Sequence, residues 1–254
     1  MGSPEEKPRP GLKLVQKLYN NVHNRFVRRT VLQPTGFREL DEVQARARKG
    51  TPMADHLVRL FTETLVRRPR LIVELGVGPG ESTFVLERVA RLTGASHVSV
   101  DIEDRAGACQ APGWLFVQAD DVEFARRFEA WCRARRLPTR IDVLFIDTSH
   151  YYEHTLREIA AYFPLLQPNG LAIFHDTNMR SLYFRKNGRM ELGWDNQRGV
   201  IRALEEHFGK HFDERRAFVD WADGFLIRHY PYCNGFTILE RVGAKRGESG
   251  PEAD

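Results

Sequence analysis

The chain has 254 residues, of which 42% are hydrophobic, and a formal net charge of +4. This length and hydrophobic content suffice for one sizeable core, so we expect one catalytic domain with appendages. No apolar run approaches the ~20 residues of a membrane span, and the opening MGSPEEKPRP lacks the apolar core of a signal peptide. The sequence therefore predicts a soluble, cytoplasmic protein without a membrane span.

The cysteines and the charge pattern exclude further classes. Cys109, Cys132 and Cys233 lie far apart without C-x-x-C spacing, which indicates neither a disulfide framework nor a zinc knuckle. Basic residues outnumber acidic ones only as 38 to 34 and occur in dispersed clusters such as RFVRR and VRRPR. Such clusters are typical of solvated helix faces, so we expect no nucleic-acid partner. The alternative in this class is a protein that binds RNA or anionic membranes through its basic N-terminal helix.

Composition divides the chain into four parts. Residues 1–10 and 243–254 are rich in Pro, Gly and charged residues, which predicts disordered ends. Residues 11–68 have helical periodicity and form the predicted N-terminal helices. Residues 69–242 form the predicted catalytic domain.

Two helices are predicted in the N-terminal part. A stripe of apolar residues at four-residue spacing indicates the first one, which we expect to pack on its own domain or on a second copy of the chain. The stripe consists of Leu14, Leu18, Val22 and Phe26. Thr51 is a plausible N-cap and Pro52 suits the first position of the second helix.

Strands and helices alternate through the catalytic part. The pattern predicts an α/β fold with a doubly wound, mostly parallel sheet. The predicted strands are LIVELG, HVSVDI, WLFVQAD, DVLFID and LAIFHD. Two later extended stretches, ADGFLIRHYP and GFTILERV, are predicted to form an antiparallel hairpin at one edge of this sheet.

A glycine-rich turn follows the first of these strands. The stretch VELGVGPGES places Gly76, Gly78 and Gly80 between a strand and a helix. Its spacing is G-x-G-x-G, not the G-x-G-x-x-G of dinucleotide sites, so it suits a ligand without a pyrophosphate. In open α/β sheets ligands bind beyond the carboxyl ends of the strands. We therefore expect a ligand at this turn, with Ser82 at the start of the following helix.

Acidic residues accompany the turn. Glu74 stands two residues before the first glycine, Asp101 closes the second strand, and Asp120 with Asp121 follows the third. We expect Asp101 to accept ribose hydroxyls and the third-strand pair to reach an adenine amine. This combination resembles the class I methyltransferases, which implies S-adenosylmethionine as cosubstrate. Glu74 suits the cationic sulfonium and ammonium groups and would repel phosphates, which disfavours the alternative of a nicotinamide-dependent oxidoreductase.

Two later strands end in residues that bind cations. Asp147 ends the fourth strand, and His175 with Asp176 ends the fifth. Because the carboxyl ends of parallel strands share one edge of the sheet, we expect these three side chains beside the methyl donor. Two carboxylates with open positions suit Mg²⁺ and can lower the pKa of a bound hydroxyl.

A longer motif surrounds these residues. The stretch FIDTSHYYEHTLREIAAYFPLLQPNGLAIFHDTN is similar to a segment of the metal-dependent family of macrocin O-methyltransferase and cephalosporin hydroxylase. The resemblance extends over about residues 71–178 and implies that Asp147 and Asp176 bind a divalent ion. This chain departs from the family at His175, where most members have Asp or Glu, and at Asn169, where they have Gly. Mg²⁺ is the expected ion, but the histidine lowers the preference for it and leaves room for Mn²⁺, Fe²⁺ or no metal.

His150 is the predicted catalytic base. It lies three residues after Asp147 and, as a neutral imidazole, can take the proton of a substrate hydroxyl. The alternative is that it caps a helix or bonds to neighbouring backbone. Tyr152 and Glu153 are expected in the first turn of the next helix, and His154 on its surface. Asn178 is a secondary candidate ligand.

A polar and aromatic segment of residues 179–197 follows the fifth strand and is long enough for a lid or a binding surface. Its aromatic and cationic side chains suit an aromatic or anionic substrate. The sequence thus predicts an S-adenosylmethionine-dependent methyltransferase that methylates a hydroxyl of a small natural-product type molecule. The alternative within the class is metal-independent transfer to oxygen or nitrogen.

Overall fold

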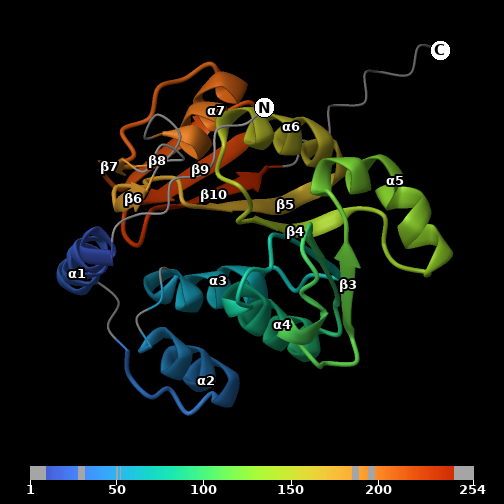
Figure 1. Ribbon diagram of the computed structural model, residues 1–254. Coiled ribbons are helices and arrows are strands. Elements are labelled where there is room, and N and C mark those ends of the chain that lie inside the picture. Colours follow the sequence, from blue (N-terminus) through green and yellow to red (C-terminus); the bar gives the residue numbers. More distant parts are fainter. Residues whose placement is uncertain are drawn as a thin grey trace, which may run out of the picture.

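The computed structural model describes residues 10–27, 32–49, 51, 53–184, 189–193 and 198–242. Its centre is an eight-stranded sheet with the order β3-β2-β1-β4-β5-β10-β9-β8. Helices cover both faces of the sheet (Figure 1). The predicted doubly wound α/β fold is confirmed.

Five parallel strands form one half of the sheet, and three antiparallel strands extend it beyond β5. The parallel strands are β1 (Leu71–Leu75), β2 (Ser96–Asp101), β3 (Trp114–Gln118), β4 (Ile141–Ile146) and β5 (Leu166–His175). The antiparallel strands are β8 (Phe218–Ala222), β9 (Phe225–Tyr230) and β10 (Phe236–Arg241). The predicted pairing of β9 with β10 is confirmed, but β10 lies inside the sheet between β5 and β9, and the edge belongs to β8.

The helices divide between the two faces. In Figure 1, α2, α3 and α4 lie below the sheet, and α5, α6 and α7 lie above it. Their bounds are α1 (Pro10–Val27), α2 (Arg38–Ala47), α3 (Ala54–Val66), α4 (Glu81–Thr93), α5 (Asp121–Ala134), α6 (Tyr152–Tyr162) and α7 (Gly199–Phe208). Helix α1 projects from the side and contacts β6 (Leu182–Phe184), which pairs with β7 (Met190–Leu192).

Each face of the sheet buries its own apolar cluster. Phe124, Phe128 and Tyr162 pack with strand residues on the side of α5 and α6. Leu57 and Phe61 of α3 pack with strand residues on the other side. Because strand side chains alternate in direction, the two-sided apolar strands fill both clusters at once. This double core holds the carboxyl ends of β1 to β5 in fixed relation.

Several predictions concern the N-terminal part and the ends. The predicted disordered segments lie outside the described residues, except that α1 already begins at Pro10. Pro52, Val22 and Phe26 lie outside the described side chains. Leu14 and Leu18 of α1 are exposed, so their packing on a second copy of the chain stays a prediction.

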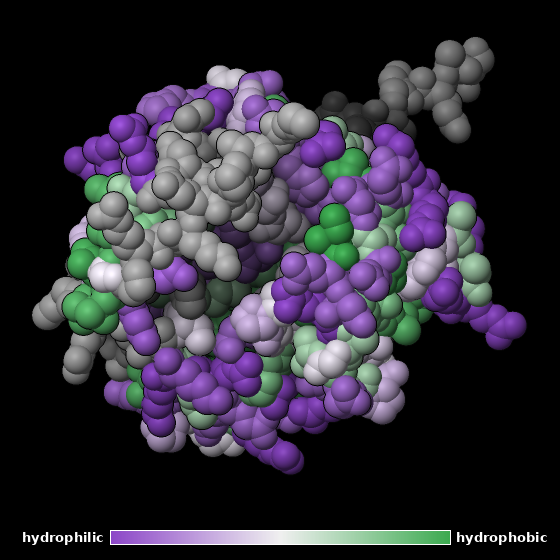
Figure 2. Space-filling view, viewed as in Figure 1, coloured by the Kyte–Doolittle hydropathy of each residue, from purple (hydrophilic) through white to green (hydrophobic). Residues whose placement is uncertain are grey.

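The surface of the molecule is more polar than its two apolar clusters. The face seen in Figure 2 is mostly hydrophilic, with scattered hydrophobic patches. Among the described residues, no helix has the length and apolar content required to cross a membrane.

Candidate active site

The glycine turn lies between β1 and α4 and touches the end of β4. Gly76 has a φ of +83°, and a Cβ at this position would lie 2.1 Å from the carbonyl oxygen of Asp147. No side chain fits there, so the glycine lets two strand ends approach each other. The backbone N–H of Asp147 donates to the carbonyl of Leu75 (2.9 Å), which fixes this approach.

Glu74 lies beneath the turn and is fully buried. Its carboxylate accepts hydrogen bonds from Ser82 (2.5 Å) and Ser99 (2.5 Å) and from the hydroxyl of Thr83. These bonds tie the start of α4 to β1 and β2, and the Glu74 side chain does not line the pocket described below. Contact of Glu74 or of its partner Ser82 with a ligand stays a prediction, and this placement does not support it.

Asp101 organises the same turn from the end of β2. Its Oδ2 accepts from the backbone N–H groups of Val77 (2.9 Å) and Gly78 (3.2 Å), and its Oδ1 accepts from Glu103 (2.9 Å). A carboxylate has about four acceptor positions, so Asp101 keeps capacity for a further donor. Its role as the ribose acceptor stays a prediction.

A cavity of about 480 Å³ runs along the carboxyl ends of β3, β2, β1 and β4. It brings together most of the predicted cosubstrate residues, but not Glu74, Gly80 or Ser82. The predicted residues that line it are Gly76, Gly78, Asp101, Asp120, Asp121 and Asp147. Ile102, 70% exposed, adds an apolar surface beside Asp101.

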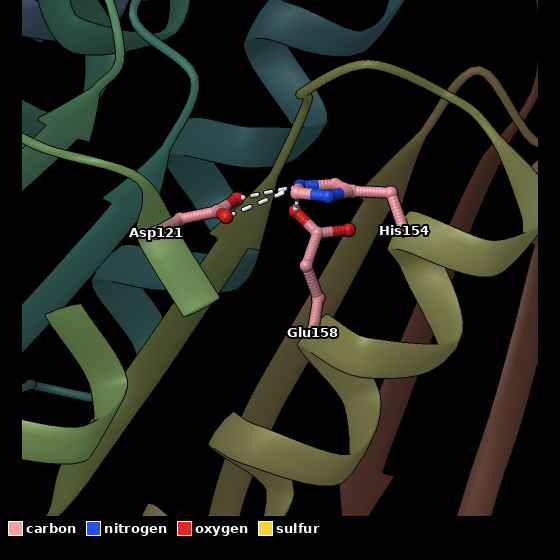
Figure 3. A group of neighbouring side chains, drawn as sticks. All are labelled: Asp121, His154 and Glu158. Atoms are coloured by element: carbon pink, nitrogen blue, oxygen red, sulfur yellow. Dashed lines mark hydrogen bonds and ion pairs between the residues drawn. The ribbon is translucent and has the colours of Figure 1, made fainter. Parts of the chain in front are cut away.

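His154 is a residue of this pocket that sequence reasoning placed on the surface. Its side chain is 17% exposed and lines the cavity together with Asp121. Its Nε2 lies 3.1 Å from the Asp121 carboxylate and 3.6 Å from Glu158 (Figure 3). The i,i+4 spacing of His154 and Glu158 was the available signal, because it places both on one face of α6.

A second cluster forms where β4 and β5 end. His150 Nε2 lies 3.0 Å from Asp147 Oδ1 and 2.9 Å from Asp176 Oδ2. His175 Nδ1 lies 3.3 Å from Oδ1 of both aspartates. The structure therefore joins all the predicted catalytic and metal residues in one group, and Asp147 links that group to the cavity.

The bond made by the other nitrogen of His175 sets the chemistry of this cluster. His175 Nε2 donates to the carbonyl oxygen of Cys233 (3.1 Å), because a carbonyl can only accept. In the neutral ring, the Nδ1 lone pair then faces two carboxylates. Ligands about 2.1 Å from an ion are about 3.0–3.4 Å apart, which matches the two separations of 3.3 Å.

A buried oxygen also fits a cation here. Asp176 Oδ1 has no hydrogen-bond partner among the described residues, although Nδ1 of His175 lies within ion-pair distance. A metal-binding histidine commonly donates its other N–H to a carbonyl, as His175 does. Asp147, His175 and Asp176 therefore fit a divalent ion, and the imidazole favours Mn²⁺ or Fe²⁺ over Mg²⁺.

The backbone is strained at this cluster. His150 and Asp176 have φ values of +60° and +57°, a region that non-glycine residues rarely adopt. Such conformations concentrate at functional sites, where the surrounding structure holds them in place. Gly235, in the turn after β9, packs closely against the backbone just beyond Asp176. A Cβ at Gly235 would lie 2.4 Å from the backbone nitrogen of Asn178, so only glycine allows this approach.

Charge is tightly coupled within the cluster. Burial opposes the charged form of His150, but the carboxylates of Asp176 and Asp147 outweigh it and raise its pKa to about 10. Burial likewise opposes a charged Asp147, yet His175 and His150 lower its pKa. A positive charge between the carboxylates of Asp147 and Asp176 is therefore stabilised, and either a proton or a metal ion can supply it.

Comparison with known proteins agrees with this geometry. A family model described as a methyltransferase domain matches residues 73–177, from β1 to the residue after Asp176. Residues 73–177 thus match a methyltransferase domain, and the sheet with its flanking helices has the fold of the class I methyltransferases. No curated protein matches this chain.

Solved structures share the fold. The methyltransferase MycE of the mycinamycin pathway, in complex with Mg, SAH and mycinamycin VI, is 20% identical over 82% of this chain, with a TM-score of 0.53. The match spans only 56% of the MycE chain. An SAH-bound methyltransferase from Podospora anserina is 16% identical over 96% of this chain and 100% of its own (TM-score 0.51). An O-methyltransferase from Bacillus cereus is 13% identical over 89% and 99% (TM-score 0.51).

Proposed function

We propose that this methyltransferase transfers the methyl group of S-adenosylmethionine to a hydroxyl oxygen of a small natural-product type molecule, with His150 as base. The observation that carries the proposal is the meeting of His150 with Asp147, His175 and Asp176 at one end of the cosubstrate cavity. MycE, whose structure holds Mg, SAH and mycinamycin VI, supports the same chemistry by its similarity of fold.

The pocket residues align the reaction. The carbon–oxygen bond to the acceptor forms as the carbon–sulfur bond breaks, and S-adenosylhomocysteine leaves. The hydroxyl proton passes to the imidazole of His150, and the carboxylates of Asp147 and Asp176 beside its Nε2 stabilise the resulting imidazolium.

Asp147, His175 and Asp176 would hold the divalent ion, with Mn²⁺ or Fe²⁺ preferred to Mg²⁺ because of the imidazole. When bound, the ion supplies charge that polarises the acceptor hydroxyl and leaves His150 unprotonated near neutral pH. The Cys233 carbonyl keeps His175 in the required tautomer.

One observation favours metal-independent transfer as a second candidate. Two carboxylates and two imidazoles stand in the cluster, so two protonated histidines balance the charge without an ion. In that state neither His150 nor His175 acts as a base until it loses its proton. Metal-independent transfer would therefore be fastest at high pH.

The test is incubation of the protein with labelled S-adenosylmethionine and a panel of catechols, sugars and other hydroxylated scaffolds, with Mn²⁺, Mg²⁺ or chelator. We expect a methyl ether product and loss of activity on chelation, restored best by Mn²⁺. Unchanged turnover under exhaustive chelation favours the second candidate. Transfer to nitrogen alone contradicts the proposed acceptor.

A further inference from the structure

The turn between β9 and β10 supplies the carbonyl that holds His175, and its backbone is strained. Three successive residues of this turn have positive φ values, namely Cys233 (+44°), Asn234 (+66°) and Gly235 (+89°). Glycine adopts this region freely and asparagine tolerates it, but a cysteine rarely does. Such a turn keeps its shape only where the surrounding structure holds it.

The backbone just beyond β5 holds the two sides of the turn. The backbone N–H of Asn178 donates to the carbonyl oxygen of Asn234 (2.5 Å). The side-chain amide of Asn178 donates to the carbonyl oxygen of Pro231 (2.8 Å). These two bonds leave the middle of the turn, at Tyr232 and Cys233, to be held from elsewhere.

The first turn of α3 holds this middle part through two adjacent residues. The Cys233 thiol donates to the carboxylate of Asp55 (3.4 Å), which is a weak bond because sulfur is a poor donor. Nε2 of His56 lies 2.5 Å from the carbonyl oxygen of Tyr232 and donates to it, because a carbonyl can only accept. Burial lowers the pKa of His56 to about 3, so the ring is neutral and carries its one hydrogen on Nε2.

Packing fixes the ring of His56 in this orientation. The buried ring stacks on Phe236 of β10, with 4.7 Å between centroids and an interplanar angle of 15°. It meets the ring of His175 edge-on at 5.7 Å. Phe236 is the partner of His175 in the pairing of β10 with β5, so His56 lies against both strands beside the cation site.

Two imidazoles thus hold two consecutive carbonyls of one strained turn. The carbonyl of Tyr232 accepts from His56, and the carbonyl of Cys233 accepts from His175 (3.1 Å). Without the first bond, the peptide group that joins Tyr232 to Cys233 can rotate and relieve the positive φ of Cys233. That rotation shifts the next carbonyl, which is the one that holds His175.

We propose that His56 is a positioning residue, which acts through this turn to keep the Cys233 carbonyl on Nε2 of His175. The neutral ring of His175 thereby presents Nδ1 to the two carboxylates of the site. The effect on metal binding rests on the proposed function, whereas the effect on His175 does not. The inference assigns a role to α3, none of whose residues lines the cavity or belongs to the ligand cluster.

The first test observes the imidazole N–H protons by NMR in the full chain labelled with nitrogen-15 histidine. The Nε2 protons of His56 and His175, assigned from their contacts with neighbouring protons, should both be protected from exchange with water. Because opening of the His56 bond frees the turn, the His175 proton should exchange at least as fast as the His56 proton. A His175 proton that exchanges much more slowly overturns the inference, and this measurement requires no variant.

Three variants separate the donor from the packing. His56→Phe keeps a stacked ring but has no donor, so it should abolish the protected His175 signal and weaken Mn²⁺ binding about tenfold, as measured by calorimetry. His56→Gln places an amide nitrogen where Nε2 lies and should restore the signal, with Mn²⁺ affinity within about threefold of the unaltered protein. Phe61→Leu reduces the buried packing of the same helix and keeps the donor, so both measurements should match those of the unaltered protein.

The outcomes are distinct. An unchanged His175 signal in His56→Phe overturns the inference, and so does an unchanged affinity in a protein that binds Mn²⁺. Equal losses in His56→Phe and His56→Gln, or the same loss in Phe61→Leu, also overturn it, because the packing of α3 alone then explains the effect. If the unaltered protein binds no Mn²⁺, the proposed metal site fails, and the His175 signal alone decides the inference.

Discussion

Two clusters in this protein contain histidine and carboxylates, yet hydrogen bonds prepare them for different chemistry. At Asp147 and Asp176, the Cys233 carbonyl accepts the Nε2 hydrogen of His175, so the neutral ring would turn its Nδ1 lone pair to the carboxylates. At Asp121, the Arg157 guanidinium occupies Nδ1 of His154 and leaves the hydrogen on Nε2. The comparison teaches that, besides residue type and spacing, the partner of the second ring nitrogen decides whether a neutral histidine turns a lone pair toward its carboxylates.

The largest expected effect comes from removing one carboxylate at a time. Asp176→Asn should lower kcat about 1,000-fold, since the base and the cation site lose a charge worth several kcal/mol. The matched change Asp121→Asn should raise KM for S-adenosylmethionine about tenfold and leave kcat near its original value. Steady-state kinetics measure both. A larger kcat loss in Asp121→Asn would reverse the roles of the clusters.

The turn between the clusters offers a matched pair of glycines. Gly76→Ala should destabilise the fold by about 4 kcal/mol, because its Cβ would lie 2.1 Å from the Asp147 carbonyl. Gly78 has a φ of +50°, but a Cβ there would meet no atom within 4 Å. Gly78→Ala should therefore destabilise the fold by only about 1 to 2 kcal/mol. Urea unfolding compares the two. Equal losses would show that the approach of the two strand ends is not tight.

His229 is a buried histidine whose two ring nitrogens contact no carboxylate. It therefore tests whether a tautomer can be assigned from hydrogen-bond partners alone. His229 Nε2 donates to the Glu214 carbonyl (2.8 Å), and Nδ1 accepts from Thr237 (2.8 Å). Burial lowers its pKa to about 4. The unfolded chain therefore binds a proton between pH 6.5 and 4 that the folded chain refuses, so stability falls as pH falls through this range.

The expected loss from His229 is up to about 3 kcal/mol, at about 1.4 kcal/mol per pKa unit. Urea unfolding of the protein and of His229→Asn at pH 7 and pH 4.5 isolates this contribution as the difference between the two pH dependences. Identical dependences would mean that His229 accepts a proton in the folded protein.

The smallest expected effect is a change of metal preference. His175→Asp supplies a third carboxylate and should shift the ratio of Mg²⁺-supported to Mn²⁺-supported activity toward Mg²⁺ by about tenfold. His154→Asp, at the other cluster, should leave that ratio unchanged. A shift in the second variant but not in the first contradicts the assignment of the ion.

Periodicity predicted the sheet and both groups of strand ends, because strands buried on two faces leave a strong apolar signal. It did not place Glu74, whose side chain lies under α4 rather than in the pocket. It left His154 on the surface because the pattern of α6 alone does not reveal that α5 packs beside it. Neither α2 nor β8 was predicted, because polar residues interrupt the apolar pattern of both segments. Tertiary contacts stabilise these elements in spite of their weak periodicity.

The tautomer of His175 could not be predicted from the sequence, because it depends on a contact between distant parts of the chain. The Cys233 carbonyl reaches His175 from 58 positions away, through the turn that joins β9 to β10. The next two residues of this turn, Asn234 and Gly235, have positive φ values, and no sequence motif indicated this conformation. The resemblance to a metal-dependent family indicated the candidate ligand positions but not the reason why a histidine could serve at one of them.

The most direct test of the central claim is calorimetric titration of the metal-free protein with Mn²⁺ in the presence of S-adenosylhomocysteine. We predict one equivalent bound by the protein and by Glu158→Gln, and none by Asp147→Asn/Asp176→Asn. The account is contradicted if the protein binds no Mn²⁺, or if Glu158→Gln loses the ion while the double variant keeps it.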